Sequence, residues 1–260
     1  MPYLNLAISA AREAGRLLRD ALMNTHDIQF KEGEYNLVTE MDGLAERTII
    51  GMIRDAHPDH TFLAEESGAT ANASDYRWII DPLDGTVNYA HGIPIFCVSI
   101  ALEVRGTVEL GVIYHPMLDE LFTAERGRGA FRNGTPIHVS AQSDFNKSLL
   151  VTGFPYNVKA NPLHCIDHFI NFVYEGRPIR RLGSAALDLA YVACGRLDGF
   201  WEVKLNPWDV AAGALLVIEA GGRLAQMDGS AWTIYNPSIL ATNGKIHDAM
   251  MAIINKAGTK

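Results

Sequence analysis

The chain of 260 residues is long enough to bury a substantial core, either as one large α/β domain or as two small domains packed together. With 48% hydrophobic and 20% charged residues it has the composition of a folded globular protein, which excludes the disordered and fibrous classes. The formal net charge of -8 offers no overall attraction to nucleic acid or anionic lipid, so we expect neither nucleic acid nor a membrane as a partner.

The cysteines and the N-terminus indicate a cytoplasmic protein. Cys97, Cys165 and Cys194 are odd in number, lack CxxC spacing and lie in apolar segments, which is typical of buried thiols in a reducing compartment. Residues 1–24 carry charges at regular intervals without a long apolar run, so we expect neither a signal peptide nor a membrane span.

The first half of the chain predicts two helices followed by a sheet. Apolar residues recur with a helical period from Leu4 to Leu22, and a second such pattern opens at Thr39 and stops before Pro58. Thr39 and Asp42 have the spacing of a capping box. The apolar runs that follow are rich in β-forming residues and predict strands at 62–64, 78–80, 96–104, 108–114 and 121–124. We therefore expect helices lying on a largely antiparallel sheet.

The second half alternates between strands and helices. Strands are predicted at 149–152, 179–182, 199–202 and 223–227, and helices at 165–174, 184–194 and 208–220. Such alternation is typical of a sheet with helices on its faces. We expect an α/β (α+β) protein with an N-terminal α+β half, residues 1–145, and a C-terminal α/β half, residues 146–260, packed as one compact unit.

The run Asp81-Pro82-Leu83-Asp84-Gly85-Thr86 directly follows a predicted strand. Pro82 fixes one φ angle and Gly85 permits a tight backbone, so Asp81, Asp84 and the Leu83 carbonyl can face one point. Two carboxylates there repel by up to roughly 4 kcal/mol at 4 Å, and their oxygen-only chemistry suits Mg²⁺. Taken alone, however, such a run is more often a turn that caps the following helix.

Two further acidic segments favour the metal site over the turn. Glu65 and Glu66 follow another predicted strand, and Asp209 lies in the first turn of the helix that begins near Pro207. Each is usually a solvated turn or a charge that suits a helix N-terminus. Because all three segments occur in one chain, we expect a shared ligand set.

Together these segments give the chain a resemblance to the inositol monophosphatase family. The resemblance rests on residues 78–88, on Glu65-Glu66-Ser67, on residues 208–213, on residues 38–42 and on residues 183–186, and it extends over nearly the whole chain. It is strongest toward the bacterial inositol-1-monophosphatases. It implies a layered α-β-α-β-α sandwich, a homodimer, and a site that uses two or three Mg²⁺ ions.

The resemblance also implies roles for single residues. Glu65, Asp81 and the Leu83 carbonyl would hold the first Mg²⁺, and Asp81, Asp84 and Asp209 the second. Thr86, backed by Asp42, would orient the attacking water, so that Asp42, Thr86 and Glu65 form the catalytic set. The implied substrate contacts are Glu65, Leu83, Asp84, Gly85, Thr86, Arg180, Ser184, Ala185, Glu202 and Asp209. Arg180 and Arg181 could both meet the substrate, but they could equally lie at the dimer interface.

The implied reaction is the hydrolysis of myo-inositol monophosphate and similar polyol or sugar phosphates, with sensitivity to lithium. Asn36 stands where an Asp is common, in a loop that helps to form the third metal site of relatives. The metal ligands leave other substrates open: fructose 1,6-bisphosphate, 3′-phosphoadenosine 5′-phosphate or histidinol phosphate. A regulatory protein that binds the transcription machinery, as some bacterial relatives do, is the alternative of a different class.

Overall fold

The structure is a computed structural model that describes residues 2–24, 28–30 and 37–256. Its helices are α1 (Pro2–Ala21), α2 (Glu40–Ala56), α3 (Thr86–Ala90), α4 (Cys165–Tyr174), α5 (Ala185–Ala193), α6 (Pro207–Glu219) and α7 (His247–Ile254), with 3₁₀ turns η1 (Phe145–Lys147), η2 (Val158–Ala160) and η3 (Pro162–His164). Its strands are β1 (Ile28–Phe30), β2 (Leu37–Thr39), β3 (Thr61–Ala64), β4 (Gly68–Ala69), β5 (Tyr76–Asp84), β6 (Cys97–Val104), β7 (Thr107–His115), β8 (Glu120–Glu125), β9 (Ala130–Arg132), β10 (Thr135–Ile137), β11 (Leu150–Thr152), β12 (Ile179–Arg180), β13 (Gly199–Val203), β14 (Arg223–Ala225) and β15 (Ser238–Thr242).

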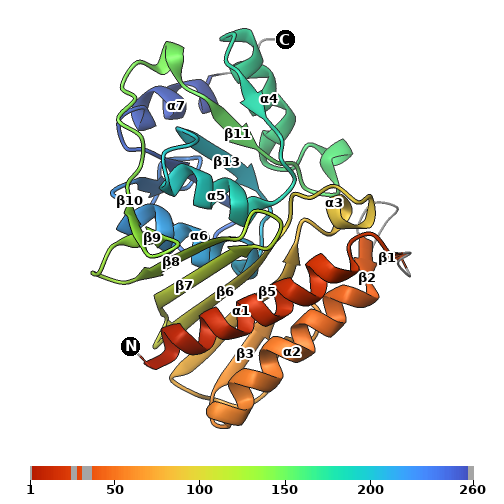
Figure 1. Ribbon diagram of the computed structural model, residues 1–260. Coiled ribbons are helices and arrows are strands. Elements are labelled where there is room, and N and C mark those ends of the chain that lie inside the picture. Colours follow the sequence, from red (N-terminus) through yellow and green to blue (C-terminus); the bar gives the residue numbers. More distant parts are fainter. Residues whose placement is uncertain (1, 25–27, 31–36, 257–260) are drawn as a thin grey trace.

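The outermost layer on the N-terminal side is the helix pair α1 and α2, which covers one face of the large sheet (Figure 1). The predicted helical period is confirmed, because the alanines Ala7, Ala11 and Ala14 of α1 are completely buried. Their small side chains let α1 approach α2 and the sheet closely. The predicted capping box at the start of α2 is confirmed as well, since the Asp42 carboxylate accepts from the Thr39 backbone N–H at 2.8 Å.

The large sheet has the strand order β10-β9-β8-β7-β6-β5-β3-β4. Its pairs are antiparallel except for β3 and β5, which run parallel with Ala64 opposite Ile80. The next residues along these two strands are Glu65 and Asp81, so both emerge at the same edge of the sheet. The predicted end of strand β5 at residue 80 is wrong: the strand continues to Asp84 through a one-residue irregularity against β6.

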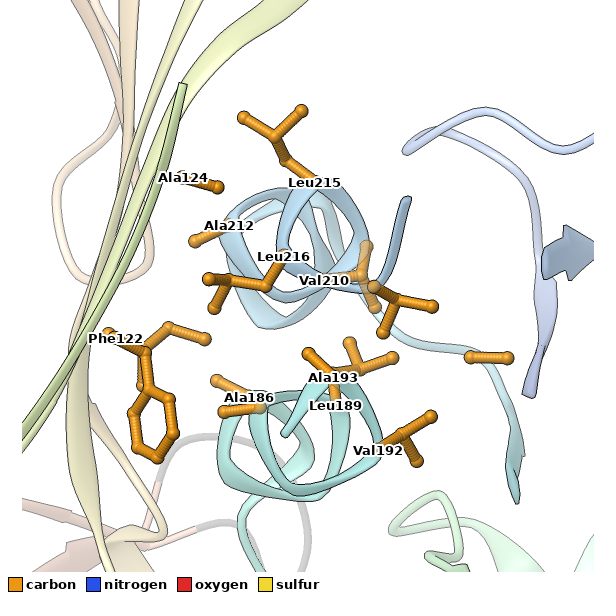
Figure 2. Packing of buried hydrophobic residues seen from close by; sticks show 14 of the residues in the cluster. Phe122, Ala124, Ala186, Leu189, Val192, Ala193, Val210, Ala212, Leu215 and Leu216 are labelled. Carbon is orange, nitrogen blue, oxygen red and sulfur yellow. The ribbon is translucent and has the colours of Figure 1, made fainter. Parts of the chain in front are cut away.

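The middle layer consists of α5 and α6, which lie between the two sheets (Figure 2). Phe122 and Ala124 of the large sheet face Ala212 and Leu216 of α6. Glycines allow the closest approach: a Cβ on Gly111 would lie 2.9 Å from the Ala212 Cα. Side chains from both sides of residue 145 thus share one core, and the division of the chain at that point stays a prediction.

The second sheet has the order β12-β11-β13-β15-β14, and α4 and α7 cover its outer face. Phe172 of α4 packs against Trp201 of β13 with ring centroids 4.2 Å apart and the ring planes tilted by 30°. The order helices, sheet, helices, sheet, helices confirms the predicted α-β-α-β-α sandwich. Strand β15 and helix α7 were not predicted. None of the helices within the described ranges is both long and apolar enough to cross a membrane.

Candidate active site

A cavity of about 750 Å³ opens between the edge of the large sheet and the N-terminal ends of α5 and α6. The predicted site residues that line it are Glu65, Asp81, Leu83, Asp84, Gly85, Thr86, Ser184, Ala185, Glu202 and Asp209. They come from strands and helices far apart in the sequence, so the fold rather than a single motif builds the site.

Glu65 and Asp81 lie side by side because β3 and β5 are parallel and in register. The backbone N–H of Glu65 donates to the Ile80 carbonyl at 3.2 Å and so extends this pairing by one residue. The turn beyond Glu65 is held by Glu46 of α2, whose carboxylate accepts from the backbone N–H groups of Glu66 at 2.8 Å and Ser67 at 3.0 Å. Glu46 therefore fixes the segment that presents Glu65.

Asp81 and Asp84 are aimed by the irregularity in β5. The extra residue turns the strand, as bulges beside active sites do, and the Asp81 carboxylate accepts from the Leu83 N–H at 3.0 Å. Gly85 then takes a left-handed conformation with φ of 105°. A Cβ there would lie 2.9 Å from the Ile95 carbonyl oxygen, so the turn that ends the strand requires glycine.

Asp84 joins the two halves of the molecule. Its Oδ2 accepts from the Ser184 hydroxyl at 2.6 Å and from the Ala186 backbone N–H at 2.7 Å, both at the start of α5. A second link runs from the Asn88 amide, which donates to the Leu182 carbonyl at 2.8 Å. These bonds fix the C-terminal wall of the cavity against the strand that carries the acidic run.

Thr86 and Asp42 form a buried pair. The Thr86 hydroxyl lies 2.9 Å from the Asp42 carboxylate and 3.0 Å from the Leu83 carbonyl oxygen. Asp42 is fully buried, and its other oxygen accepts from both the N–H and the hydroxyl of Thr39. The same hydrogen bonds that cap α2 therefore hold the carboxylate that supports Thr86.

Asp209 approaches from the opposite side, in the first turn of α6. Pro207 occupies the start of this helix, where a missing N–H is tolerated. The Asp209 carboxylate accepts from the Asn206 backbone N–H at 2.6 Å, which sets its direction. Glu202 of β13 forms the far wall, where its carboxylate rests on Gly153, since a Cβ on Gly153 would overlap it.

The sequence pattern of the inositol monophosphatase family matches residues 1–259. The chain belongs to this family. An inositol-1-monophosphatase of Mesorhizobium japonicum is 43% identical over 97% of the chain and 96% of the relative. The Nus factor SuhB of Escherichia coli is 44% identical over 96% of the chain and 95% of that protein. The crystal structure of the extragenic suppressor protein SuhB from Bartonella henselae superposes with a TM-score of 0.93 at 41% identity, covering 99% of this chain and all of that one.

The carboxyl groups that line the cavity lie close enough to raise one another's pKa. Burial raises the pKa of Asp81 well above its ordinary value, and the charges of Glu65, Asp84 and Asp209 add to the rise. Burial likewise raises the pKa of Asp209, reinforced by Asp84 and Glu65. The pKa of Asp84 rises to about 6 through burial, although its hydrogen bonds from Ser184 and Ala186 oppose the shift. A cation bound among these groups would favour their ionised forms.

The donors fit magnesium by their chemistry. All are carboxylate or carbonyl oxygens, which a hard divalent cation prefers. Within the ranges that the structure describes, no group of three His, Cys, Asp or Glu side chains is arranged so that it could hold a metal ion as it stands. Two of the expected ligands make other contacts: Asp84 accepts from the Ser184 hydroxyl and Asp209 from the Asn206 backbone N–H.

The structure separates the two arginines that the sequence offered as possible substrate contacts. Arg180, a predicted substrate contact, does not line the cavity; its guanidinium contacts the Ile179 carbonyl at 3.2 Å. Arg181 lines the cavity instead, because consecutive residues at the end of a strand point to opposite sides. Asn36 lies outside the described residues, so the prediction about a third metal site stays a prediction.

Two acidic residues of the site were missed. Glu46 lies one helical turn after Asp42 on the buried face of α2. A charged residue on the apolar face of a predicted helix is visible in the sequence and could have indicated a role for Glu46. Asp188 lies in the apolar helix α5 and lines the cavity. Its position in the site depends on how α5 is turned, which the sequence did not reveal.

Proposed function

We propose that this chain is a magnesium-dependent phosphomonoesterase that hydrolyses myo-inositol monophosphate and similar polyol or sugar phosphates to the free alcohol and phosphate. The observation that carries the proposal is the convergence of Glu65, Asp81, Asp84 and Asp209 on one cavity, beside the Thr86–Asp42 pair. Family membership and the similarity to a protein named inositol-1-monophosphatase support the same reaction.

The proposed ligands divide into two sets. Glu65, Asp81 and the Leu83 carbonyl would hold one Mg²⁺, and Asp81, Asp84 and Asp209 the other. When bound, magnesium supplies the positive charge that activates a water molecule and neutralises the phosphate oxygens. Asp81 belongs to both sets, which agrees with its place between Glu65 and Asp84 at the sheet edge.

Thr86 would position the attacking water. Its hydroxyl donates its single proton toward Asp42, which leaves the lone pairs of Oγ1 to accept a hydrogen bond from that water. Burial raises the pKa of Asp42, although its hydrogen bonds from Thr39 and Thr86 oppose the shift. Asp42 can therefore take up the proton that passes along this pair.

The phosphate would lie at the acidic edge, against the backbone of Gly85 and Thr86, and the polyol would extend toward Ser184, Ala185 and Glu202. Arg181 rather than Arg180 would contact the substrate, because Arg181 lines the cavity and Arg180 does not. The charge of Arg181 opposes the rise that burial causes in the pKa of Glu202, which reaches about 8.

A panel of phosphate esters tests the proposal. Phosphate release from inositol 1-phosphate is compared with release from fructose 1,6-bisphosphate, 3′-phosphoadenosine 5′-phosphate and histidinol phosphate, each with Mg²⁺ and with EDTA. We expect the highest kcat/KM for inositol 1-phosphate and no turnover with EDTA. Preference for one of the other esters would assign the same chemistry to that substrate, and turnover of none would overturn the proposal.

Two further family properties belong to the proposal: inhibition by lithium and a homodimer. Adding Li⁺ at fixed Mg²⁺ should lower the rate of phosphate release. Light scattering should give twice the mass of one chain. A monomer with full activity, or a rate that lithium leaves unchanged, would remove the corresponding property.

A regulatory role is a second candidate, favoured by the similarity over nearly the whole chain to proteins named Nus factor SuhB. We propose that the fold can also bind a component of the transcription machinery. Binding of the wild type to a purified transcription complex, retained by an Asp84→Asn variant, would support a role separate from hydrolysis. Lack of binding by the wild type would exclude it.

A further inference from the structure

Asp188 occupies a part of the cavity that the proposed reaction does not yet use. It follows Ser184 by four residues along α5, so that one face of the helix presents Ser184, Ala185 and Asp188 to the cavity. Only 1% of its surface is exposed. The helix is apolar on both sides of it, with Leu187 and Leu189 completely buried.

The Asp188 carboxyl group has a buried oxygen without a hydrogen-bond partner. This oxygen is Oδ1, and no group in the described part of the chain donates a hydrogen bond to it. A buried carboxyl group without a partner is destabilising, and an apolar residue of similar shape would usually be more stable at such a position. Asp188 is thus poorly explained by folding alone and well placed for a ligand.

The surroundings indicate what kind of ligand this is. Glu202 is the charge that most strongly affects Asp188, followed by Asp84, and Arg181 acts in the opposite direction. A neutral group that can both donate and accept a hydrogen bond, such as an alcohol, suits a carboxyl group beside a carboxylate.

We propose that Asp188 is a specificity-determining residue that hydrogen-bonds a hydroxyl group of the substrate polyol, next to the hydroxyl group bound by Glu202. The inference rests on the proposed function, in which the polyol extends over Ser184 and Ala185 toward Glu202. Neighbouring carboxyl groups on α5 and β13 then select substrates with adjacent hydroxyl groups over phosphate esters that lack them.

Burial raises the pKa of Asp188 well above its ordinary value, and Glu202 and Asp84 add to the rise. The amide group of Asn has the shape of the carboxyl group, and it both donates and accepts hydrogen bonds. Asp188→Asn should therefore keep the recognition of the polyol, whereas Asp188→Leu keeps the shape of the side chain and removes its hydrogen bonds. The two variants are matched in size and differ only in polar contacts.

The test compares kcat/KM for inositol 1-phosphate and for 4-nitrophenyl phosphate, an ester whose leaving group has no adjacent hydroxyl groups. For Asp188→Leu we expect the ratio of the two values to fall about 10- to 100-fold, and for Asp188→Asn less than about 3-fold. We also expect Asp188→Leu to raise the melting temperature, because it removes an unpaired buried carboxyl group. An unchanged ratio in Asp188→Leu, or an equal fall in both variants, would overturn the inference.

Binding of free myo-inositol, measured by calorimetry with Mg²⁺ and inorganic phosphate present, separates this inference from the proposed function. If the wild type hydrolyses neither ester, the proposed function fails, and the binding measurement decides the inference. Binding by the wild type and Asp188→Asn but at least about 10-fold weaker by Asp188→Leu would support it. Equal binding by all three proteins, or binding by none, would overturn it.

Discussion

Replacing Asp84 by Asn should abolish catalysis and stabilise the metal-free protein. The Asn side-chain oxygen can accept the hydrogen bonds that Ser184 and Ala186 now donate to Oδ2, so the link between the two halves survives. The amide nitrogen then faces the cavity in place of a ligand oxygen. Since even residues behind a metal ligand change activity 10- to 100-fold, we expect loss of a ligand to lower kcat/KM by more than about 100-fold.

The stability change follows from the pKa of Asp84, which burial raises from 3.8 to about 6. When the pKa of an acidic group is raised in the folded state, the protein keeps its full stability below the unfolded-state pKa of that group. It loses stability as the pH rises through the folded-state pKa. The rise corresponds to about 3 kcal/mol, and solvent in the open cavity screens it to about 1–2 kcal/mol. Asn carries no charge, so at pH 7.5 the metal-free variant should melt about 2–8 °C higher than the wild type.

Two measurements decide this prediction: phosphate release with Mg²⁺, and thermal unfolding in EDTA followed by circular dichroism. Mg²⁺ should raise the melting temperature of the wild type and leave that of the variant nearly unchanged, because bound ligands stabilise only the state that binds them. Asp84→Ser is a harsher control that shortens the side chain. Full activity in Asp84→Asn would refute the metal assignment, and a lower melting temperature in EDTA would refute the account of the buried charge.

Three further variants test other parts of the site. Thr86→Val keeps the shape of the side chain but loses its hydroxyl group, so kcat should fall about 100- to 10,000-fold, whereas kcat of Thr86→Ser should stay close to that of the wild type. Equal kcat values for Thr86→Val and the wild type would exclude a catalytic role for the Thr86–Asp42 pair. Glu46→Ala should weaken Mg²⁺ binding, measured by calorimetry, about 10- to 100-fold, because it frees the turn after Glu65. Glu46→Gln should restore part of the binding. Unchanged binding by Glu46→Ala would contradict the role of Glu46 in holding this turn. In EDTA, Glu202→Gln should become more stable than the wild type as the pH rises from 4.5 to 8, because burial raises the pKa of Glu202 to about 8. A difference in stability between the two proteins that stays constant across this range would contradict the raised pKa.

Much of the fold follows from local pattern, and the exceptions have physical reasons. The helical period of α1 and the capping box of α2 are visible in the sequence and are confirmed. Strand β5 runs past its predicted end because pairing of Asp84 with Cys97 of β6 carries the strand across Pro82. Strand β15 consists of five buried residues. In so short a run, the spacing of apolar residues does not distinguish a strand from a helix.

The candidate site could be predicted only where its residues form compact motifs. Asp81 and Asp84 at the end of β5, Glu65 and Asp209 are recognisable by residue type and position, and all four line the cavity. Asp188 is not recognisable in this way, and the sequence does not decide between Arg180 and Arg181. The directions of these side chains depend on how α5 and the end of β12 pack against the large sheet. Whether each predicted residue has its proposed role stays a prediction.

The central claim is that the acidic cavity binds magnesium and uses it to hydrolyse a phosphate ester. The most direct test is the rate of phosphate release from inositol 1-phosphate as Mg²⁺ is titrated into the metal-free wild type, with Asp84→Asn measured in parallel. We predict no release without metal, a rise to saturation with Mg²⁺ in the wild type, and no rise in the variant. Release at the same rate in EDTA, or an equal response of the two proteins to Mg²⁺, would contradict the claim.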